Sequence, residues 1–516
     1  MVNAFVPAAR GKAVVVGAGI GGLAAAVALR RTGWQVEVYE RAAELGEVGA
    51  AVSIAPNAVK ALRELGLEPD LLAAACALDG LESRTRGGRR ITGVESALLK
   101  DRYSAGLYNV HRAALYKILR DALGDTAIHT GHAATGVVEG VASGEAGDFA
   151  VHTGHTATGV TEGVGPREAD GCAIHTGHAT TELTAGVASG ETGDSAIHTG
   201  HAATGITGGV ASGETGASAI HTDRAATGAA AGVASSETGE TSGAATRTRH
   251  TASGAAANGT GASVVFDGPN GQVTVDADLV VVADGVRSKL RAQLFPHYPG
   301  PAYAGYTVWR GLVPAEAADR IGVPTRLSET WGRGSRFGSA PIGDGRAYWY
   351  AFENAEPGAA HEHRVADLVS RFADWHHPVP ALIAATPTEA LLRNDVYYLA
   401  EPLESFTAGI VALLGDAAHA VTPDIGQGAC LAIEDAVVLA AELSAAEVPA
   451  ALRAYDAARR PRAAALARES GRIGRMLMNP SRIASGIRDA SASVVPPSIA
   501  MKTIADIYDW NPPRLT

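Results

Sequence analysis

The clearest hydrophobic pattern lies near the N-terminus, between Ala13 and Glu40. Ala13–Val16 is an apolar run rich in β-branched residues, which predicts a buried strand. The alanine-rich stretch Leu23–Arg31 predicts a helix, and the alternation over Gln35–Tyr39 predicts a second strand. The order of these elements indicates a strand–turn–helix–strand unit.

Further along, amphipathic stretches predict helices and short apolar runs predict buried strands. The predicted helices are 57–65, 111–123, 430–444, 450–470 and 481–506, and the predicted strands are 279–283, 391–398 and 410–414. Between 297 and 400 many aromatic residues alternate with other residues, as in Arg346–Phe352. This alternation predicts an antiparallel sheet with one face that covers another part of the molecule.

A tandem repeat interrupts these elements. The tetrad His-Thr-x-x recurs every 23 residues, at 129, 152, 175, 198 and 221. The first copy predicts one strand of a hairpin that resumes with Ser263–Phe266 and Val273–Val275, so residues 141–261 are an insertion. We expect this insertion to be a loosely ordered loop, because few bulky side chains are available to offset the chain entropy. Stacked coils of a small β-solenoid are the alternative, since the apolar positions of the copies would align in rows. Paired histidines such as His129 and His132 do not predict a metal site, because residues three apart in a strand point to opposite faces.

Composition adds limits to this picture. A chain of 516 residues is long enough for two or three domains, and a net charge of −11 argues against nucleic acid as a main partner. The three cysteines are far apart and match no metal-binding spacing, which favours a reduced, cytoplasmic setting. The first twelve residues are too short and too polar for a signal peptide. The uncharged run Ala13–Leu29 holds four glycines, which fit a turn better than a membrane span.

Three glycines, Gly17, Gly19 and Gly22, stand at G-x-G-x-x-G spacing directly after the first strand. In this motif the first glycine permits a tight turn, the second lets the backbone approach a pyrophosphate, and the third lets helix pack on strand. The helix N-terminus supplies free N–H groups to the phosphates. Glu40 closes the second strand, where an acid accepts ribose hydroxyls. The segment therefore predicts a dinucleotide site, and the alternative is a glycine-rich turn without a ligand.

Two later turns carry similar signals. Asp284-Gly285 follows the apolar run 279–283, and Gly415-Asp416 follows the run 410–414. The segment Pro423–Gly428 then precedes a predicted helix, whose N-terminus is a place to hold partial negative charge. Arg112 lies in the first turn of another predicted helix, where it opposes the helix dipole and indicates an anion nearby, unless it is a solvated surface residue.

Together these three motifs resemble the single-component FAD-dependent aromatic hydroxylases, the class A flavoprotein monooxygenases. The resemblance covers about residues 12–125 and 262–470, and TPDIGQGACLAIEDAVVLA and GYTVWRGLV are most similar to the branch of salicylate, 3-hydroxybenzoate and urate hydroxylases. It implies an α/β fold like that of p-hydroxybenzoate hydroxylase: a Rossmann-type FAD-binding domain and a substrate domain with a mixed or antiparallel sheet, here with an inserted tandem repeat. We expect the FAD-binding domain over 1–80, 107–140, 262–296 and 401–445, the insertion over 141–261, the substrate domain over 81–106 and 297–400, and C-terminal helices over 446–516.

The resemblance also implies roles for single residues. Those implied to bind the cofactor are Gly17, Gly19, Ile20, Gly22, Glu40, Arg41, Arg112, Asp284, Gly285, Gly415, Asp416, Pro423, Gly426, Gln427 and Gly428. Among them, Arg112 and Asp416 match the family residues near the flavin ribityl chain. The candidates for orienting or deprotonating a substrate are Arg310, Tyr306, His419 and Asp424, although His419 could instead satisfy the loop after Gly415.

The implied reaction starts with hydride transfer from NAD(P)H to FAD, and no second G-x-G-x-x-G is needed because the nicotinamide binds transiently. A C4a-hydroperoxyflavin then transfers one oxygen atom of O2 to an aromatic or polyketide-like small molecule, in a pocket that excludes water. Epoxidation, Baeyer–Villiger insertion and a flavin dehydrogenase or reductase remain alternatives, as does an interaction protein that keeps FAD structurally. We expect a cytoplasmic monomer or homodimer without a nucleic-acid partner, a metal or stable membrane insertion.

Overall fold

The computed structural model describes residues 10–46, 51–139, 150–154, 173–178, 197–201, 261–359 and 365–515. The chain divides into two compact units, residues 1–140 with 245–516, and residues 141–244. The N-terminal nine residues, Cys172, and the repeat copies beyond residue 201 lie outside the described residues.

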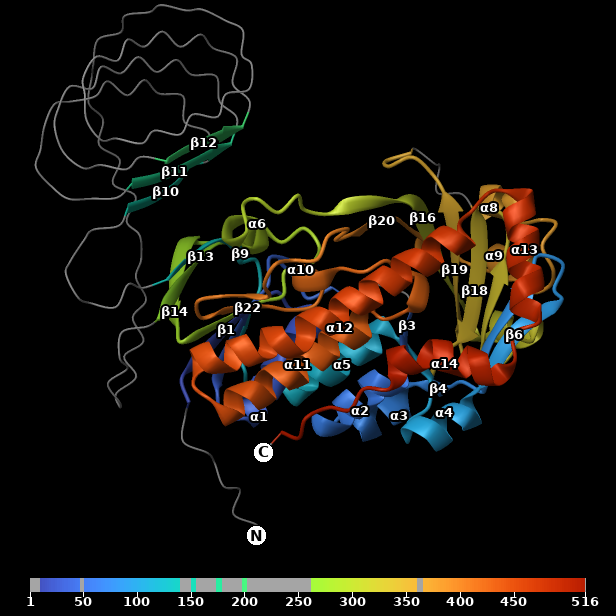
Figure 1. The fold of residues 1–516 in the computed structure, drawn as a ribbon, viewed down its shortest axis with the longest axis horizontal. Coiled ribbons are helices and arrows are strands. Elements are labelled where there is room, and N and C mark those ends of the chain that lie inside the picture. The colour runs from blue at the N-terminus through green and yellow to red at the C-terminus, as the bar shows by residue number, and fades with distance from the viewer. Residues whose placement is uncertain are drawn as a thin grey trace, which may run out of the picture. The chain divides into compact units, whose positions relative to one another are not determined.

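A six-stranded sheet in the order β21-β22-β15-β1-β2-β8 lies in the larger unit (Figure 1). Its strands are β1 (Lys12–Val16), β2 (Gln35–Tyr39), β8 (Ile128–His129), β15 (Leu279–Val282), β21 (Thr407–Ala408) and β22 (Val411–Leu413). All neighbours run parallel except β21 and β22. Every residue of β15 and β22 is buried, as is typical of parallel strands covered on both faces. The strands predicted from apolar runs are confirmed here.

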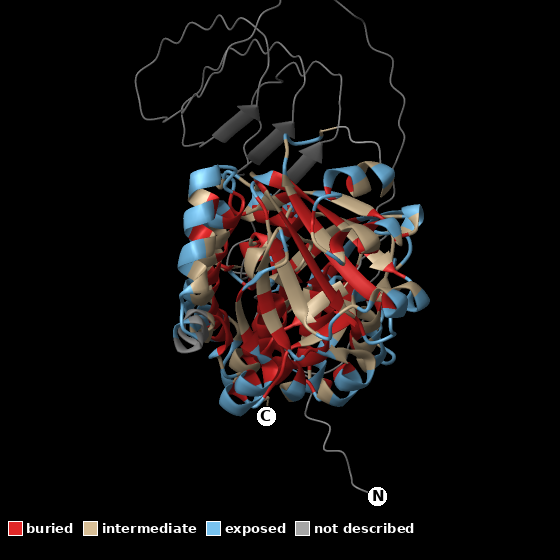
Figure 2. Ribbon diagram, turned by 90° about the vertical axis from the view of Figure 1, so that its right-hand side faces the viewer, coloured by how far each residue is buried: buried red, intermediate tan, exposed pale blue. Residues whose placement is uncertain are grey.

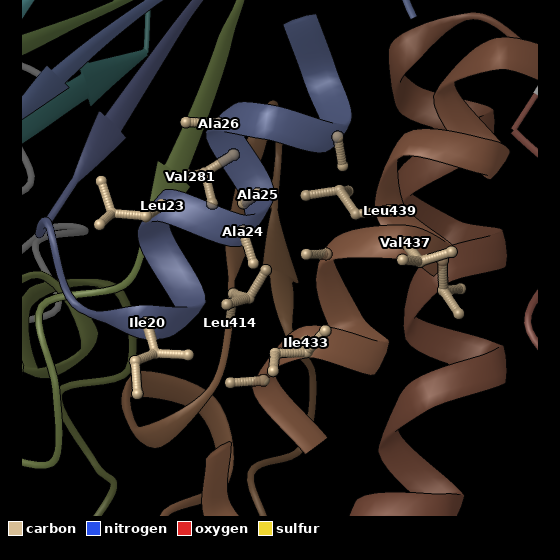
Figure 3. Close-up of a cluster of buried hydrophobic side chains, with 14 of the residues drawn as sticks. Ile20, Leu23, Ala24, Ala25, Ala26, Val281, Leu414, Ile433, Val437 and Leu439 are labelled. Carbon is tan, nitrogen blue, oxygen red and sulfur yellow. The ribbon is translucent and has the colours of Figure 1, made fainter. Parts of the chain in front are cut away.

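Helix α1 (Ile20–Arg31) follows β1, and α11 (Gly428–Ala445) packs closely against it. Small residues permit this contact: a Cβ on Gly21 would lie 2.8 Å from Leu414 and 3.0 Å from Ala432. Figure 3 shows Ala24 and Ala25 of α1 in the apolar cluster shared with α11. The packing therefore brings two segments that lie about four hundred residues apart into one place, at the carboxyl ends of the parallel strands, where ligands bind in such sheets.

A seven-stranded sheet runs in the order β20-β16-β19-β18-β17-β5-β6. Its strands are β5 (Gly80–Thr85), β6 (Arg90–Glu95), β16 (Ala302–Val313), β17 (Leu327–Trp331), β18 (Ser335–Pro341), β19 (Ala347–Asn354) and β20 (Leu392–Tyr398). Neighbours are antiparallel except β17 and β5, which confirms the sheet predicted from the aromatic alternation. On one face Trp309 and Trp349 pack against α7 (Ala315–Ile321), α8 (Val365–Arg371) and α9 (Val379–Ala384).

Two small antiparallel sheets complete the larger unit. One pairs β3 (Ala51–Ile54), β7 (Tyr108–His111) and β4 (Cys76–Ala77), and the other pairs β14 (Gly271–Ala277), β13 (Ala262–Gly268) and β9 (Ala133–Glu139). Glu139 is opposite Ala262, so the chain leaves for the insertion and returns at neighbouring positions. This register confirms the predicted hairpin and its interruption.

The remaining helices pack around the strands. They are α2 (Pro56–Glu64), α3 (Glu68–Ala74), α4 (Ser96–Tyr103), α5 (Arg112–Ala122), α6 (Lys289–Leu294), α10 (Asp416–His419), α12 (Val448–Leu477), α13 (Arg482–Ser493) and α14 (Pro497–Tyr508), with 3₁₀ turns η1 (Thr388–Ala390) and η2 (Pro423–Ile425). Helices α2 and α10 are largely buried, while Figure 2 shows most exposed residues on the outer sides of helices and in loops. The helical range predicted over 481–506 is confirmed, and Pro496 and Pro497 divide it into α13 and α14. No helix in the described part of the chain is both long and apolar enough to span a bilayer.

In the smaller unit, β10 (Ala150–Gly154), β11 (Ala173–His178) and β12 (Ile197–His201) form a parallel sheet. His152 is opposite His175, and His175 is opposite His198, so the strands pair at the period of the repeat. These three strands favour the alternative of stacked coils over the expected loose loop, because segments of similar sequence can pair their backbones in register. The described contacts place both large sheets in one unit, so the boundary between cofactor and substrate domains stays a prediction.

Candidate functional site

A cavity of about 1450 Å³ lies between the carboxyl ends of the parallel strands and the seven-stranded sheet. One end, here called the loop end, is lined by the segments 19–21, 283–287, 415–416 and 423–429. The other, called the sheet end, is lined by side chains of the seven-stranded sheet that include Arg310, Trp331, Tyr348, Tyr350 and Phe352. Two predicted segments that are distant in the sequence, at Gly19 and at Asp416, therefore face the same space.

The three glycines of the N-terminal motif have different surroundings. A Cβ on Gly17 would lie 2.4 Å from the carbonyl oxygen of Ala283, and one on Gly22 would lie 1.9 Å from that of Gly17. Both residues therefore shape the turn behind the cavity wall. A Cβ on Gly19 would meet no protein atom within 4 Å, and Gly19 lines the cavity together with Ile20. Of the three glycines, Gly19 is thus the one whose backbone is open to a ligand.

Glu40 stabilises the turn of the N-terminal glycine motif through hydrogen bonds. Its Oε2 accepts a hydrogen bond from the backbone N–H of Ala18 at 2.8 Å, and its Oε1 accepts one from Ala42 at 2.9 Å. Glu40 is not among the residues that line the cavity, whereas the adjacent Arg41 is. Contact of Glu40 with a ribose stays a prediction.

Opposite charges face the cavity where α10 and α5 begin. Asp416 is open to the cavity, and the surrounding protein raises the pKa of its carboxyl by screening it from bulk water, while His419 and Arg112 lower that pKa. The pKa of Arg112 is lowered by burial and by Arg310, and is raised by Asp416. The N-terminus of α11, at Gly428, lies beside Asp416 and adds partial positive charge. This corner can hold both hydroxyl groups and an anion.

The turn after β15 is also incompletely satisfied. Oδ2 of Asp284 accepts a hydrogen bond from the N–H of Lys289 at 3.2 Å, but its buried Oδ1 has no partner within the described residues. Burial raises the pKa of this carboxyl. Gly285 has φ +88°, and a Cβ there would meet nothing within 4 Å. An orphan acceptor and open backbone positions at Gly19 and Gly285 fit the hydroxyls and phosphates of the predicted FAD.

His419 does not face the cavity, so the prediction that it acts on a substrate is wrong. Its Nε2 lies 2.5 Å from Oδ2 of Asp435, which also accepts the N–H of Gly415 at 3.0 Å. Arg459 donates to the other oxygen of Asp435 at 2.7 Å. Burial alone raises the pKa of Asp435, but His419 and Arg459 lower it to about 2. This buried cluster satisfies the loop after Gly415, which is the alternative stated for His419.

Tyr306 is also displaced from the main cavity. Its hydroxyl donates to Oδ2 of Asp424 at 2.7 Å, while the guanidinium of the fully buried Arg336 bonds the other oxygen of Asp424. Arg336 also lies 3.4 Å from Glu329 and stacks 4.1 Å from the ring of Phe352. The network ties η2 to the seven-stranded sheet. Tyr306 is a support for Asp424 here, because its hydroxyl is used and it does not line the main cavity.

Of the remaining candidates, Arg310 lines the sheet end, with Nη1 3.4 Å from Oδ1 of Asn394, and Asp424 lines the cavity within its network. Gln427 lines the wall with its backbone, because its side chain accepts from buried Asn57 at 2.8 Å. Sequence reasoning missed Arg336 and Asn57. Neither carries a local signal, since Arg336 lies in an ordinary strand pattern and Asn57 in an ordinary helix.

Known proteins are similar to this chain in sequence. Residues 236–470 match the family model described as FAD binding domain, and residues 15–61 match that described as NAD(P)-binding Rossmann-like domain. The chain is 31% identical to aurachin C monooxygenase/isomerase of Stigmatella aurantiaca over 465 residues, which cover 90% of this chain and 88% of the relative. It is 29% identical to FAD-dependent urate hydroxylase of Klebsiella pneumoniae over 454 residues, 87% of this chain and 85% of the relative.

Among solved structures, the chain is similar to Klebsiella pneumoniae HpxO complexed with FAD and uric acid. The TM-score is 0.67 at 25% identity, and the match covers 97% of each chain. A salicylate hydroxylase substrate complex has the same fold, with a TM-score of 0.60 at 18% identity, over 97% of this chain and 95% of the other.

Proposed function

Because this chain belongs to the FAD-dependent aromatic hydroxylases, a family of flavoprotein monooxygenases, we propose that its substrate is an apolar aromatic or polyketide-like molecule bound at the sheet end of the cavity. The enzyme is a flavin monooxygenase that uses FAD, NAD(P)H and O2. The relatives named above act on different molecules, so their names alone do not give the substrate.

A single observation carries the proposal: one cavity joins the glycine loops to an aromatic wall. FAD, when bound, supplies the redox chemistry and the activation of O2. Gly19 and the N-terminus of α1 would hold its phosphates, and Asp284 and Asp416 would accept hydrogen bonds from its hydroxyl groups. These assignments are proposals that rest on the open backbone at Gly19 and on the orphan oxygen of Asp284.

At the sheet end the chain's own residues prepare a dry, oriented pocket. Tyr348, Tyr350 and Phe352 alternate with the tryptophan face of the sheet, so their rings form an apolar wall. We propose that Arg310 donates hydrogen bonds to an oxygen of the substrate, since it lines the wall and its five N–H donors exceed its bonds to Asn394, at 3.4 Å, and to Tyr348. An aromatic wall beside a cation suits a phenolic ring, and its apolar surface helps to exclude water, which would divert the reduced flavin's reaction with O2 to peroxide.

Purified full-length protein tests the proposal. We expect bound FAD, seen by absorbance and by release on denaturation, and NAD(P)H oxidation that rises with one member of a panel of phenolic acids, purines and polycyclic phenols. The product mass should increase by one oxygen atom. Turnover without O2 would favour a dehydrogenase, and a colourless protein without flavin would refute the proposal.

Product structure separates the alternatives on this scaffold. Zeaxanthin epoxidase of Solanum lycopersicum is 39% identical over 212 residues, 37% of this chain and 30% of that protein. An epoxide product would show that the enzyme is an epoxidase. A ring-expanded lactone would show that it carries out a Baeyer–Villiger insertion. We further propose a cytoplasmic enzyme, because NAD(P)H is an intracellular reductant, and light scattering of the same sample distinguishes a monomer from a homodimer.

A further inference from the structure

Helix α13 has its polar side turned inward and its apolar side turned outward. Ile483, Ile487 and Val494 are 75%, 65% and 78% exposed, and their spacing places them on one face of the helix. On the opposite side Ser485 and Arg488 are buried. Surface helices normally show the reverse arrangement, so this outward face needs a partner.

The inward side is held by specific contacts of Arg488. Its guanidinium donates to the carbonyl oxygen of Gly332 at 3.0 Å and to that of Leu477 at 3.1 Å, and it pairs with Asp489 at 2.8 Å. It also lies 5.3 Å from the ring of Trp331. The helix cannot rotate to bury its isoleucines without breaking the hydrogen bonds of this buried arginine to Gly332 and Leu477, which is costly. The outward apolar face is therefore fixed by the fold.

Part of the exposed apolar surface around α13 also borders the cavity. Met476 and Val495 are exposed at their surface and also line the cavity, which reaches Ser491 and Ala492 on α13. Of the nine large hydrophobic side chains that are exposed among the described residues, six lie between Met476 and Ile499. Apolar surface is thus gathered around the entrance rather than scattered over the molecule.

Positive charge flanks this apolar surface. Arg475 and Arg482 are exposed, and neither has a carboxylate within ion-pair distance among the residues that the structure describes. The chain as a whole carries a net charge of −11. A local pair of uncompensated arginines in an acidic protein favours an anionic partner.

We propose that the entrance patch, consisting of Met476, Ile483, Ile487, Val494 and Val495 with Arg475 and Arg482, docks on an anionic membrane surface. A lipophilic aromatic substrate then passes from the bilayer into the cavity, and this second part rests on the proposed function. The geometry matches an interfacial helix, which lies in the surface with its apolar face buried in the lipid and basic residues beside it.

A second copy of the chain suits the patch less well. Stable protein interfaces bury about 800 Å² on each partner, from about 20–30 residues. The entrance patch has seven residues on one short helix and its flanks. Membrane binding needs no complementary shape, and the continuity of the patch with the cavity gives it a use.

Vesicle flotation of the full-length FAD-loaded protein tests the docking. We expect it to float with vesicles of equal parts phosphatidylglycerol and phosphatidylcholine and to bind pure phosphatidylcholine weakly. Ile483→Asp with Ile487→Asp should lower the bound fraction about tenfold, because charge replaces the apolar contact. Arg475→Glu with Arg482→Glu should lower it about as much and remove its salt dependence.

Leu72→Asp is the matched control, since Leu72 is also exposed but lies on α3, away from the entrance, and it should bind like the wild type. Unchanged melting temperature and FAD content show that the variants fold. Equal flotation of the wild type and the isoleucine double variant overturns the docking, as does a wild-type dimer that the double variant converts to monomers. Turnover of a water-soluble phenol by the wild type is measured in parallel, without vesicles. If the wild type floats but turns over no substrate, the proposed function alone is overturned. If it turns over substrate but does not float, the docking alone is overturned.

Discussion

The two ends of the cavity are built in opposite ways. At the loop end the wall is mostly backbone, held by glycines and by alanine-rich helices that pack without space for a side chain. At the sheet end the wall consists of large side chains, and a buried arginine joins two carboxylates behind it. The loop end therefore has a fixed shape that suits a constant cofactor, while the sheet end can change shape through single substitutions, as varied substrates require.

The largest expected effect is at Gly22, behind the loop end. Gly22→Val places a branched side chain where even a Cβ would lie 1.9 Å from a carbonyl oxygen, so the turn cannot close. We expect a loss of stability of about 3 kcal/mol or more and little bound FAD. The measurements are melting temperature and flavin content. Gly87→Val, at an exposed glycine with open space, is the control, and equal behaviour of the two variants would contradict this account.

At the sheet end, Arg336→Met removes the only cation of a buried network within the described contacts. Asp424 and Glu329 then face each other without a counter-charge, which should cost about 3–5 kcal/mol. Thermal and chemical unfolding measure this loss. Arg333→Met, at an exposed arginine nearby, should cost almost nothing, so an Arg336 variant as stable as the wild type would show that the network is not a support.

Gly19→Val should affect FAD binding without affecting the stability of the fold. Gly19 has φ −71°, which any residue adopts, and a Cβ there meets no protein atom. We expect the apoprotein to melt at the wild-type temperature, while FAD binds about 100-fold more weakly, which corresponds to about 2.7 kcal/mol. Fluorescence titration of the apoprotein with FAD gives the affinity. Unchanged FAD affinity would show that the pyrophosphate does not bind beside Gly19.

The anchor of the loop end should respond to acid. The pKa of Asp435 is lowered to about 2, so its contribution to stability is present above the unfolded value near 4 and is lost as the pH falls toward 2. The loss is about 2 kcal/mol at most. His419→Gln removes part of the cause, so its melting temperature should fall less steeply between pH 4 and pH 2. Parallel curves for the two proteins would show that His419 does not set this pKa.

The smallest effect is expected from Arg310→Met at the sheet end. Loss of one hydrogen bond to the substrate should raise KM about tenfold, which corresponds to about 1.4 kcal/mol, and leave kcat within about twofold. Steady-state NAD(P)H oxidation measures both constants. Arg320→Met, on the exposed surface of α7, is the control. A loss of kcat without a change in KM would place Arg310 in the chemical step rather than in binding.

The sequence by itself determined the elements whose signals are local. The spacing of Gly17, Gly19 and Gly22, the apolar runs of β15 and β22, and the aromatic alternation in β19 each fit within a short window, and each predicted the element that forms. The resemblance then gave the family, because three such windows occur in one order.

Tertiary structure alone decided which polar groups face the cavity. His419 turns inward because Asp435 and Arg459 lie behind it, and Tyr306 is used by Asp424. Contacts between distant parts of the chain decided three further features. They are the parallel pairing of β17 with β5, the Arg336 network, and the bonds of Arg488 that hold the apolar face of α13 outward. The burial of a side chain depends on what packs against it, and no pattern in a residue's own neighbourhood records that.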